Sequence, residues 1–147
     1  AEMLVASKKY FPSSDISILS AAVADYSPKN VSKLKIKKKQ KSLYIDLEPT
    51  VDILKTLSQI KKENQILVGF ALETDNEEQN ARQKMLKKNL DFIILNSLND
   101  RGAGFKHDTN KISIIEKNNI HKFELKSKQE VAADIVNHII KFNLHEK

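Results

Sequence analysis

The chain has 147 residues, of which 40% are hydrophobic and 30% charged, and its formal net charge is +6. These values are typical of one globular domain with one core, and no apolar run is long enough for a membrane-spanning helix. The absence of cysteine excludes disulfides and thiolate metal sites and fits a cytoplasmic protein.

The chain opens with a predicted helix over residues 1–11, with Met3, Leu4, Tyr10 and Phe11 facing inward. No capping residue precedes this helix, so we expect it to continue a segment upstream of Ala1. Residues 16–22 form an apolar run of strand length, which predicts a strand buried on both faces.

A lysine-rich stretch follows this strand and contains no acidic residue. Its lysines are Lys29, Lys33, Lys35, Lys37, Lys38, Lys39 and Lys41. Charges of one sign this close together repel unless solvent, an acidic partner or a polyanion screens them. Residues 33–39 and 43–47 alternate apolar and polar side chains, which predicts a two-stranded ribbon with one apolar and one basic face. Such a ribbon must pack on the domain or on a partner chain.

The remaining elements alternate between helices and strands. Thr50 is the predicted N-cap of a helix over 51–63, and Asp75 or Asn76 the cap of a helix ending at residue 89. Residues 66–71 and 91–95 predict buried strands, residues 111–116 and 120–125 a hairpin, and residues 128–143 a last helix. The side chains expected to face the core from these helices are Leu54, Leu57, Ile60, Ala81, Met85, Leu86, Val131, Ile135, Ile139 and Ile140.

Short buried strands that alternate with helices predict a single α/β domain over residues 1–147. We expect a Rossmann-like three-layer parallel sheet with helices on both faces, plus a protruding β-ribbon and a C-terminal hairpin. In such sheets ligands bind beyond the carboxyl ends of the strands, which here are 21–25, 71–74 and the loop from Asn96 onward, with 99–104 strongly polar.

Several common site types are not favoured by the sequence. The chain has three glycines, too few for a phosphate loop or a dinucleotide-binding turn, and no serine lies in a nucleophile-elbow context. The four histidines lack metal-ligand spacing, which argues against a metal–histidine site. They are His107, His121, His138 and His145.

Three features near the predicted strand ends have both a binding and a structural interpretation. The carboxylate of Asp25 can accept hydrogen bonds from ribose or help position a metal, or it can form an Asx turn before Pro28. Lys84 and Lys88 share one helix face and can clamp a triphosphate, or they can simply be solvated. Phe70 can stack on a base or fill the core.

Several sequence blocks occur in a distinctive order: AAVADYSP, KLKIKKK, VDIL, VGFALET, ARQKMLKKNLDFIILN and GFKHDTNKISII. Together they resemble phosphopantothenate–cysteine ligase, which in bacteria is usually the C-terminal half of a bifunctional coenzyme A biosynthesis protein. The resemblance covers nearly the whole chain. The sequence departs from the family pattern in two places. The family's upstream glycine-rich segment is not part of it, and Thr50-Val51-Asp52-Ile53 stands where the family usually has Asn-Pro-Asp-Ile.

The resemblance implies ligation of 4′-phosphopantothenate and L-cysteine through an acyl-cytidylate, with CTP as co-substrate and Mg²⁺ as cofactor. It implies that Lys35 is a catalytic lysine that reaches the triphosphate from a mobile loop. It also implies a homodimer and a fused or associated flavin-dependent decarboxylase. The implied nucleotide-binding residues are Leu19, Ser20, Ala21, Asp25, Lys35, Val51, Asp52, Ile53, Leu54, Phe70, Lys84 and Lys88.

Other functions stay open at the level of sequence. A nucleic-acid-binding module could use the lysines to follow a phosphate backbone, although two arginines and 6% aromatic residues disfavour it. A noncatalytic fragment could bind nucleotide or dimerise through the ribbon without turnover. The choice between CTP and ATP is also left open.

Overall fold

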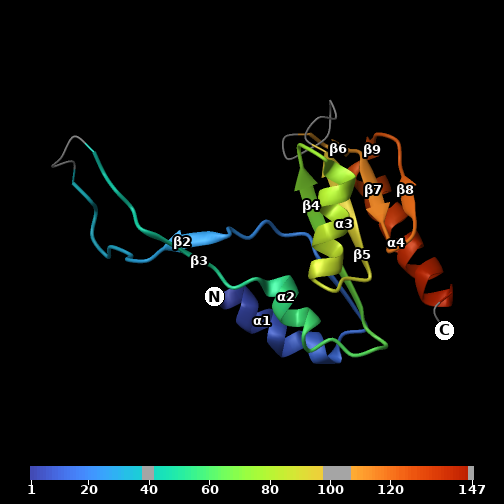
Figure 1. The fold of residues 1–147 in the computed structure, drawn as a ribbon, viewed down its shortest axis with the longest axis horizontal. Helices are drawn as coiled ribbons and strands as arrows, with labels where there is room; N and C mark the ends of the chain where they lie inside the picture. The colour runs from blue at the N-terminus through green and yellow to red at the C-terminus, as the bar shows by residue number, and fades with distance from the viewer. Residues whose placement is uncertain (38–41, 98–106, 146–147) are drawn as a thin grey trace.

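The centre of the molecule is a five-stranded sheet with the strand order β1-β4-β5-β7-β8. The computed structural model describes residues 1–37, 42–97 and 107–145. Strands β1 (Ile16–Leu19), β4 (Ile66–Glu73) and β5 (Phe92–Ser97) run parallel. Strands β7 (Ile112–Ile115) and β8 (Ile120–Lys122) extend the sheet in antiparallel directions, as Figure 1 shows. The predicted α/β fold with its C-terminal hairpin is therefore confirmed.

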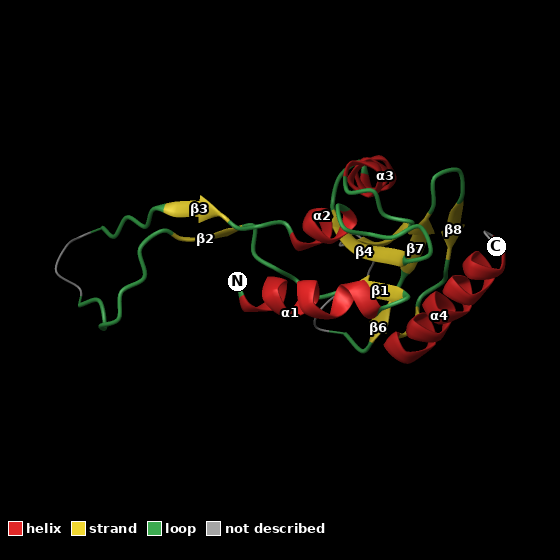
Figure 2. Cartoon of the chain, turned by 90° about the horizontal axis from the view of Figure 1, so that it is seen from below, coloured by secondary structure: helices red, strands yellow, loops and turns green. Residues whose placement is uncertain are grey.

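Helices cover both faces of this sheet (Figure 2). On one face, α2 (Ile53–Ser58) and α3 (Glu77–Lys87) bury Leu57, Ala81 and Met85 against the strands. Helix α1 (Glu2–Tyr10) and the 3₁₀ turn η1 (Phe11–Ser13) add Leu4 and Phe11 to the same cluster. Helix α4 (Lys128–His145) covers the other face. None of the helices in the described ranges is long and apolar enough to cross a membrane.

Helix α4 begins at a side-chain cap. The Ser127 hydroxyl oxygen accepts from the Glu130 N–H at 3.2 Å, and Oε2 of Glu130 accepts from the Ser127 N–H at 3.0 Å. This reciprocal pattern satisfies backbone groups that the first helical turn leaves open. Two short antiparallel strands, β6 (Thr109–Asn110) and β9 (Lys126–Ser127), lie beside this start.

Strand β1 differs from the prediction in length and in burial. It ends at Leu19 rather than at Ala22, and Ile16 and Ile18 keep 42% and 43% of their surface exposed. The prediction of a strand buried on both faces is therefore wrong for β1. The reason is that β1 is an edge strand of the described sheet, and the core cluster under α4 contains no β1 residue.

The ribbon exists, but its paired segments are not the predicted ones. Strands β2 (Tyr26–Pro28) and β3 (Leu47–Pro49) pair in antiparallel fashion, and the ribbon extends away from the sheet (Figure 1). Residues 33–37 and 43–46 form no strand, so pairing of 33–39 with 43–47 is wrong for its described part. Lys38, Lys39, Lys41 and the loop 99–104 lie outside the described residues. Within the described part of the ribbon, strand pairing is confined to its base, because an isolated two-stranded ribbon gains little stability in water.

Several helix details also differ from the prediction. Asp52, not Thr50, caps α2, which ends at Ser58 rather than near residue 63. Consecutive helix residues point about 100° apart, so one neighbour of each buried residue is turned outward. This applies to Leu86 beside Met85. Predicted core residues that are instead exposed are Met3, Tyr10, Ile60, Leu86 and Ile140. Predicted core residues that are buried are Phe11, Leu57, Ala81, Met85, Val131, Ile135 and Ile139.

Candidate functional site

A cavity of about 330 Å³ lies where the first two parallel strands end, between the start of α2 and the face of α3. Its position agrees with the rule that ligands of open α/β sheets bind beyond the carboxyl ends of the strands. It brings together every residue predicted to bind nucleotide except Lys35. These residues are Leu19, Ser20, Ala21, Asp25, Val51, Asp52, Ile53, Leu54, Phe70, Lys84 and Lys88.

One wall of the cavity is the chain from Leu19 to Asp25. Its small residues leave the backbone accessible to a flat ligand. The Asp25 carboxylate has no hydrogen-bond or ion-pair partner among the residues that the structure describes, so the Asx turn is not formed there. The backbone of this wall is held by Thr50, whose N–H donates to the Asp25 carbonyl at 2.8 Å and whose hydroxyl donates to the Ala24 carbonyl at 2.6 Å.

The opposite wall begins at the N-terminus of α2. Oδ1 of Asp52 accepts the N–H of Lys55 at 3.0 Å and thereby caps the helix. Its Oδ2 lies 2.9 Å from Nζ of Lys88 on α3. Partial burial acts to raise the pKa of Asp52, but the Lys55 hydrogen bond and Lys88 together hold that pKa below its ordinary value. Asp52 is therefore an anion that fixes the position of Lys88.

Helix α3 supplies the positive charge of the cavity. Lys84 and Lys88 lie four residues apart, and both line the cavity as the helical spacing predicts. The side chain of Lys88 is only 19% exposed and forms an ion pair with Asp52. Within the described part of the chain Lys84 forms no ion pair, so its ammonium group is available to bind an anionic ligand.

Phe70 occupies a boundary between the core and the cavity. It packs against the apolar cluster under α4 and also lines the cavity. The neighbouring Gly69 faces the other side, where a Cβ atom would lie 2.8 Å from a Leu90 methyl and 3.0 Å from a Leu54 methyl. Glycine at this position lets Leu54 approach the strand and form part of the cavity wall.

The structure does not bring Lys35 to the cavity. Lys35 lies on the ribbon, with its side chain exposed. The cavity also includes Thr50, which is predicted only as a helix cap. Val23 and Asn96 line it as well, and both lie at the strand ends where the sequence predicts the ligand-binding crevice, although neither is among the residues implied to bind nucleotide.

A second cavity, of about 520 Å³, lies at the N-terminus of α3. Three carboxylates line it, from Asp75, Glu77 and Glu78, against the two lysines Lys111 and Lys122, and Glu78 forms an ion pair with Lys122 at 2.6 Å. The excess of carboxylates disfavours a polyphosphate. The 330 Å³ cavity, which holds most of the residues predicted to bind nucleotide, is therefore the better candidate for a nucleotide.

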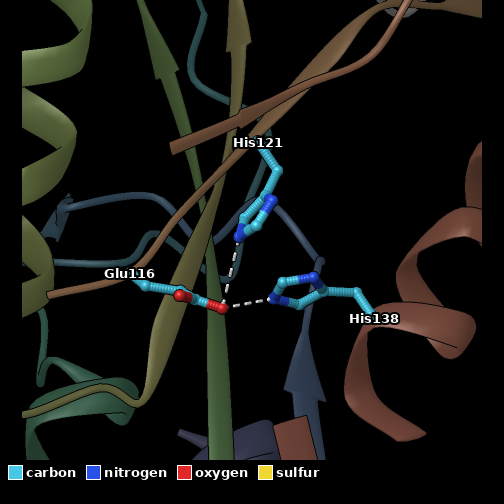
Figure 3. A group of neighbouring side chains, drawn as sticks. All are labelled: Glu116, His121 and His138. Carbon is cyan, nitrogen blue, oxygen red and sulfur yellow. Dashed lines mark ion pairs between the residues drawn. The ribbon is translucent and has the colours of Figure 1, made fainter. Parts of the chain in front are cut away.

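Two of the histidines that the sequence separates meet in space. His121 on β8 and His138 on α4 lie beside Glu116, as Figure 3 shows. Burial lowers the pKa of His138, the charges of His121 and Lys141 act in the same direction, and Glu116 opposes them. The lack of metal-ligand spacing in the sequence does not reveal this pair, because sequence spacing carries no information on a contact between a hairpin and a distant helix.

Comparisons with known proteins agree with this architecture. The family model of the DNA/pantothenate metabolism flavoprotein C-terminal domain matches residues 1–142. The solved structure of the C-terminal domain of the coenzyme A biosynthesis bifunctional protein CoaBC superposes with a TM-score of 0.77 at 36% identity, over 99% of this chain and 65% of that chain.

Two curated relatives are substantially longer than this chain. The bifunctional protein CoaBC of Bacillus subtilis (strain 168) is 47% identical over 141 residues, which are 95% of this chain and 34% of that protein. A protein named cysteine/cysteine sulfinic acid decarboxylase, from an unknown prokaryotic organism, is 57% identical over 141 residues, 95% of this chain and 39% of that protein. The chain thus spans well under half the length of these relatives.

Proposed function

Because the chain belongs to the family of the DNA/pantothenate metabolism flavoprotein C-terminal domain, we propose that it ligates 4′-phosphopantothenate to L-cysteine with CTP as co-substrate. The observation that carries this proposal is the 330 Å³ cavity, in which residues from separate parts of the sequence meet at the carboxyl ends of parallel strands. The name of the Bacillus subtilis relative, a coenzyme A biosynthesis protein, supports the same reaction class.

The proposed reaction has two steps. A carboxylate oxygen of phosphopantothenate attacks the α-phosphorus of CTP, the bond from this phosphorus to the bridging oxygen of the β-phosphate breaks, and pyrophosphate leaves. The amine of cysteine then attacks the acyl carbon, loses a proton and displaces CMP. Negative charge builds on phosphate oxygens in the first step, so cations placed beforehand lower its barrier.

The cavity residues suit these tasks. Lys84 and Lys88 would contact the phosphates, and Asp52 would hold Lys88 in place before the nucleotide binds. The unpartnered carboxylate of Asp25 would accept hydrogen bonds from the ribose hydroxyls. Phe70 and the small residues of the first wall would enclose the base and sugar.

Mg²⁺ is part of this proposal. Magnesium prefers oxygen ligands and usually binds through one or two carboxylates together with substrate phosphates. The cavity fits this requirement, since the Asp25 carboxylate has no partner among the described residues and could hold the ion with the triphosphate instead of contacting the ribose. When bound, Mg²⁺ would neutralise charge on the phosphate oxygens.

The ribbon supports a homodimer as the acting form. Its side chains are not packed on the domain: Leu34 is 82% exposed, Tyr44 88% and Ile45 58%. Exposed apolar groups gathered on one segment are typical of an interaction surface. A second copy would cover them. Sedimentation of the protein with and without residues 29–46 tests this, and an unchanged mass after deletion would rule out the ribbon as the interface.

Calorimetric titration with CTP and Mg²⁺ tests the nucleotide site. It should be performed on the native protein that contains this chain, and binding is expected to weaken on Lys84→Met. Failure of the folded protein to bind CTP would overturn the proposal. Parallel titrations with ATP and with duplex DNA decide between the nucleotides and test the nucleic-acid alternative.

Lys35 requires its own test, because it lies outside the cavity. Lys35→Gln should abolish amide synthesis while leaving CTP binding largely intact, if the ribbon brings this lysine to the phosphates only during reaction. Lys33→Gln, an equally exposed change on the same ribbon segment, is the matched control. Equal rates for both variants would exclude the catalytic role of Lys35. Absence of amide synthesis by the unsubstituted protein would favour the alternative that the chain binds nucleotide or dimerises without catalysis.

A further inference from the structure

A cluster of two histidines and one glutamate lies at the opposite edge of the sheet from the nucleotide cavity. Glu116 directly follows β7, whose last residue, Ile115, pairs with Ile93 at the start of β5. His121 lies on β8, where it pairs with Ile114 of β7, and the side chain of His138 reaches Glu116 from α4 (Figure 3). The cluster therefore joins the hairpin to the helix and takes no part in the proposed ligase site.

The distances within the cluster suit a shared metal ion. Nε2 of His138 lies 2.8 Å from Oε1 of Glu116, and Nε2 of His121 lies 3.6 Å from the same oxygen. All three ligand atoms lie within 4.8 Å of one another. With bonds of about 2.0–2.1 Å, the ligand atoms of a tetrahedral Zn²⁺ ion are ~3.3 Å apart. Only small side-chain adjustments separate the observed arrangement from this geometry.

The buried Nε2 atom of His138 has a charged neighbour, the carboxylate of Glu116, but no hydrogen bond of standard geometry among the described residues. The His138 side chain is 11% exposed, and Nε2 lies 2.8 Å from Oε1 of Glu116 as an ion pair. Buried polar atoms in proteins nearly always have a partner, so an exception calls for an explanation such as an ion. The imidazole is also held in orientation by Phe92, whose ring meets it edge-on with centroids 5.1 Å apart.

The glutamate is positioned by groups that leave one of its oxygens for the cluster. Its second oxygen, Oε2, accepts from Nδ2 of Asn119 at 3.2 Å. Its backbone N–H donates to the Asn119 carbonyl at 3.0 Å, and its carbonyl accepts from Nη1 of Arg82 at 2.7 Å. Metal-ligating carboxylates are commonly oriented by hydrogen bonds of this kind.

We propose that Glu116, His121 and His138 bind a divalent transition metal ion of the zinc type. Two imidazole nitrogens and a carboxylate suit Zn²⁺, whereas Mg²⁺ and Ca²⁺ prefer sites made of oxygen. Water fills the remaining position, since His121 is partly exposed. The ion links α4 to the hairpin and so stabilises the C-terminal part of the fold.

Zinc binding to the metal-stripped protein tests the proposal. Competition against a chromophoric chelator should show one tight site, and Zn²⁺ at 100 times its Kd should raise the folding equilibrium constant about 100-fold. His121→Gln changes an exposed side chain and should weaken Zn²⁺ binding at least tenfold. His107→Gln, at another exposed histidine, is the matched control and should leave the affinity unchanged. Added Mg²⁺ should not compete.

Two results would overturn this inference. One is equal Zn²⁺ affinity in the unsubstituted protein and in His121→Gln. The other comes from NMR of the unsubstituted protein, which does not depend on any variant folding. Stoichiometric Zn²⁺ should shift the imidazole signals of His121 and His138 and leave that of His107 in place. Unshifted signals from the first two would exclude the site, whatever the outcome for CTP binding.

Discussion

Gln65 is the buried polar residue whose replacement should affect stability most. It is 4% exposed, and its Nε2 donates to the carbonyls of Phe11 and Ser14, both at 2.7 Å. Its Oε1 accepts from the N–H of Lys62 at 2.9 Å. Gln65→Leu removes these three hydrogen bonds at nearly constant size. At about 1 kcal/mol net for each bond, the free energy of unfolding should fall by ~3 kcal/mol.

Urea denaturation measures this loss, which should lower the midpoint without changing the slope. In a thermal scan the midpoint should fall by about 6–12 °C for a chain of this size. Gln79→Leu makes the same chemical change at an exposed position of α3 and should alter stability by less than about 0.5 kcal/mol. A loss below about 1 kcal/mol for Gln65→Leu would mean that water replaces the lost bonds, and the reasoning would be refuted.

Three further predictions concern the cavity. Lys88→Met should weaken CTP binding about tenfold, or by about 1.4 kcal/mol, whereas Lys87→Met on the exposed side of the same helix should not; equal effects would point to net charge alone. The folded pKa of Asp52 is depressed, so its charge stabilises the fold above a pH of about 4, and this contribution disappears as the pH falls through the lower folded value. Urea titrations should show Asp52→Asn less stable at neutral pH by under about 1 kcal/mol and equal to the unsubstituted protein at the lowest pH; a constant difference would disprove the charge effect. Gly69→Ala places a methyl group against two leucines and should cost roughly 1–2 kcal/mol and weaken CTP binding by displacing one cavity wall, to be checked by the same two assays.

The sequence predicts those parts of the fold that depend on strong periodicity. Two such parts are the apolar runs of β4 and β5 and the helix face of Ala81 and Met85. They are visible in the sequence because buried positions are apolar. The ribbon shows the limit of this reasoning. Alternation of apolar and polar residues at 33–39 and 43–47 predicts two strands. Stable pairing of these strands also requires packing on the domain or on a partner chain, which the sequence pattern does not reveal. Exposure of Ile16 and Ile18 likewise depends on the position of β1 at the edge of the sheet.

The candidate site follows a similar division. Asp25, Lys84 and Lys88 line one cavity, as strand ends and helical spacing predict, and their role in binding stays a prediction. The role of Thr50 in holding the Asp25 backbone was missed, since a threonine before a helix is equally typical of an N-cap. The cluster around His138 was missed altogether, because it forms between a hairpin and a helix that no spacing rule relates.

The hydrogen bonds of Thr50 give the ribbon a mechanical consequence. They tie the two legs of the ribbon together at its base, where Ala24 and Asp25 end one leg and Thr50 ends the other. Asp25 and Thr50 also line the cavity. The base of the ribbon and the wall of the ligand site therefore share the residues that these hydrogen bonds join. By thermodynamic reciprocity, a ligand that changes the positions of Asp25 and Thr50 must also bias the orientation of the ribbon that begins at these residues.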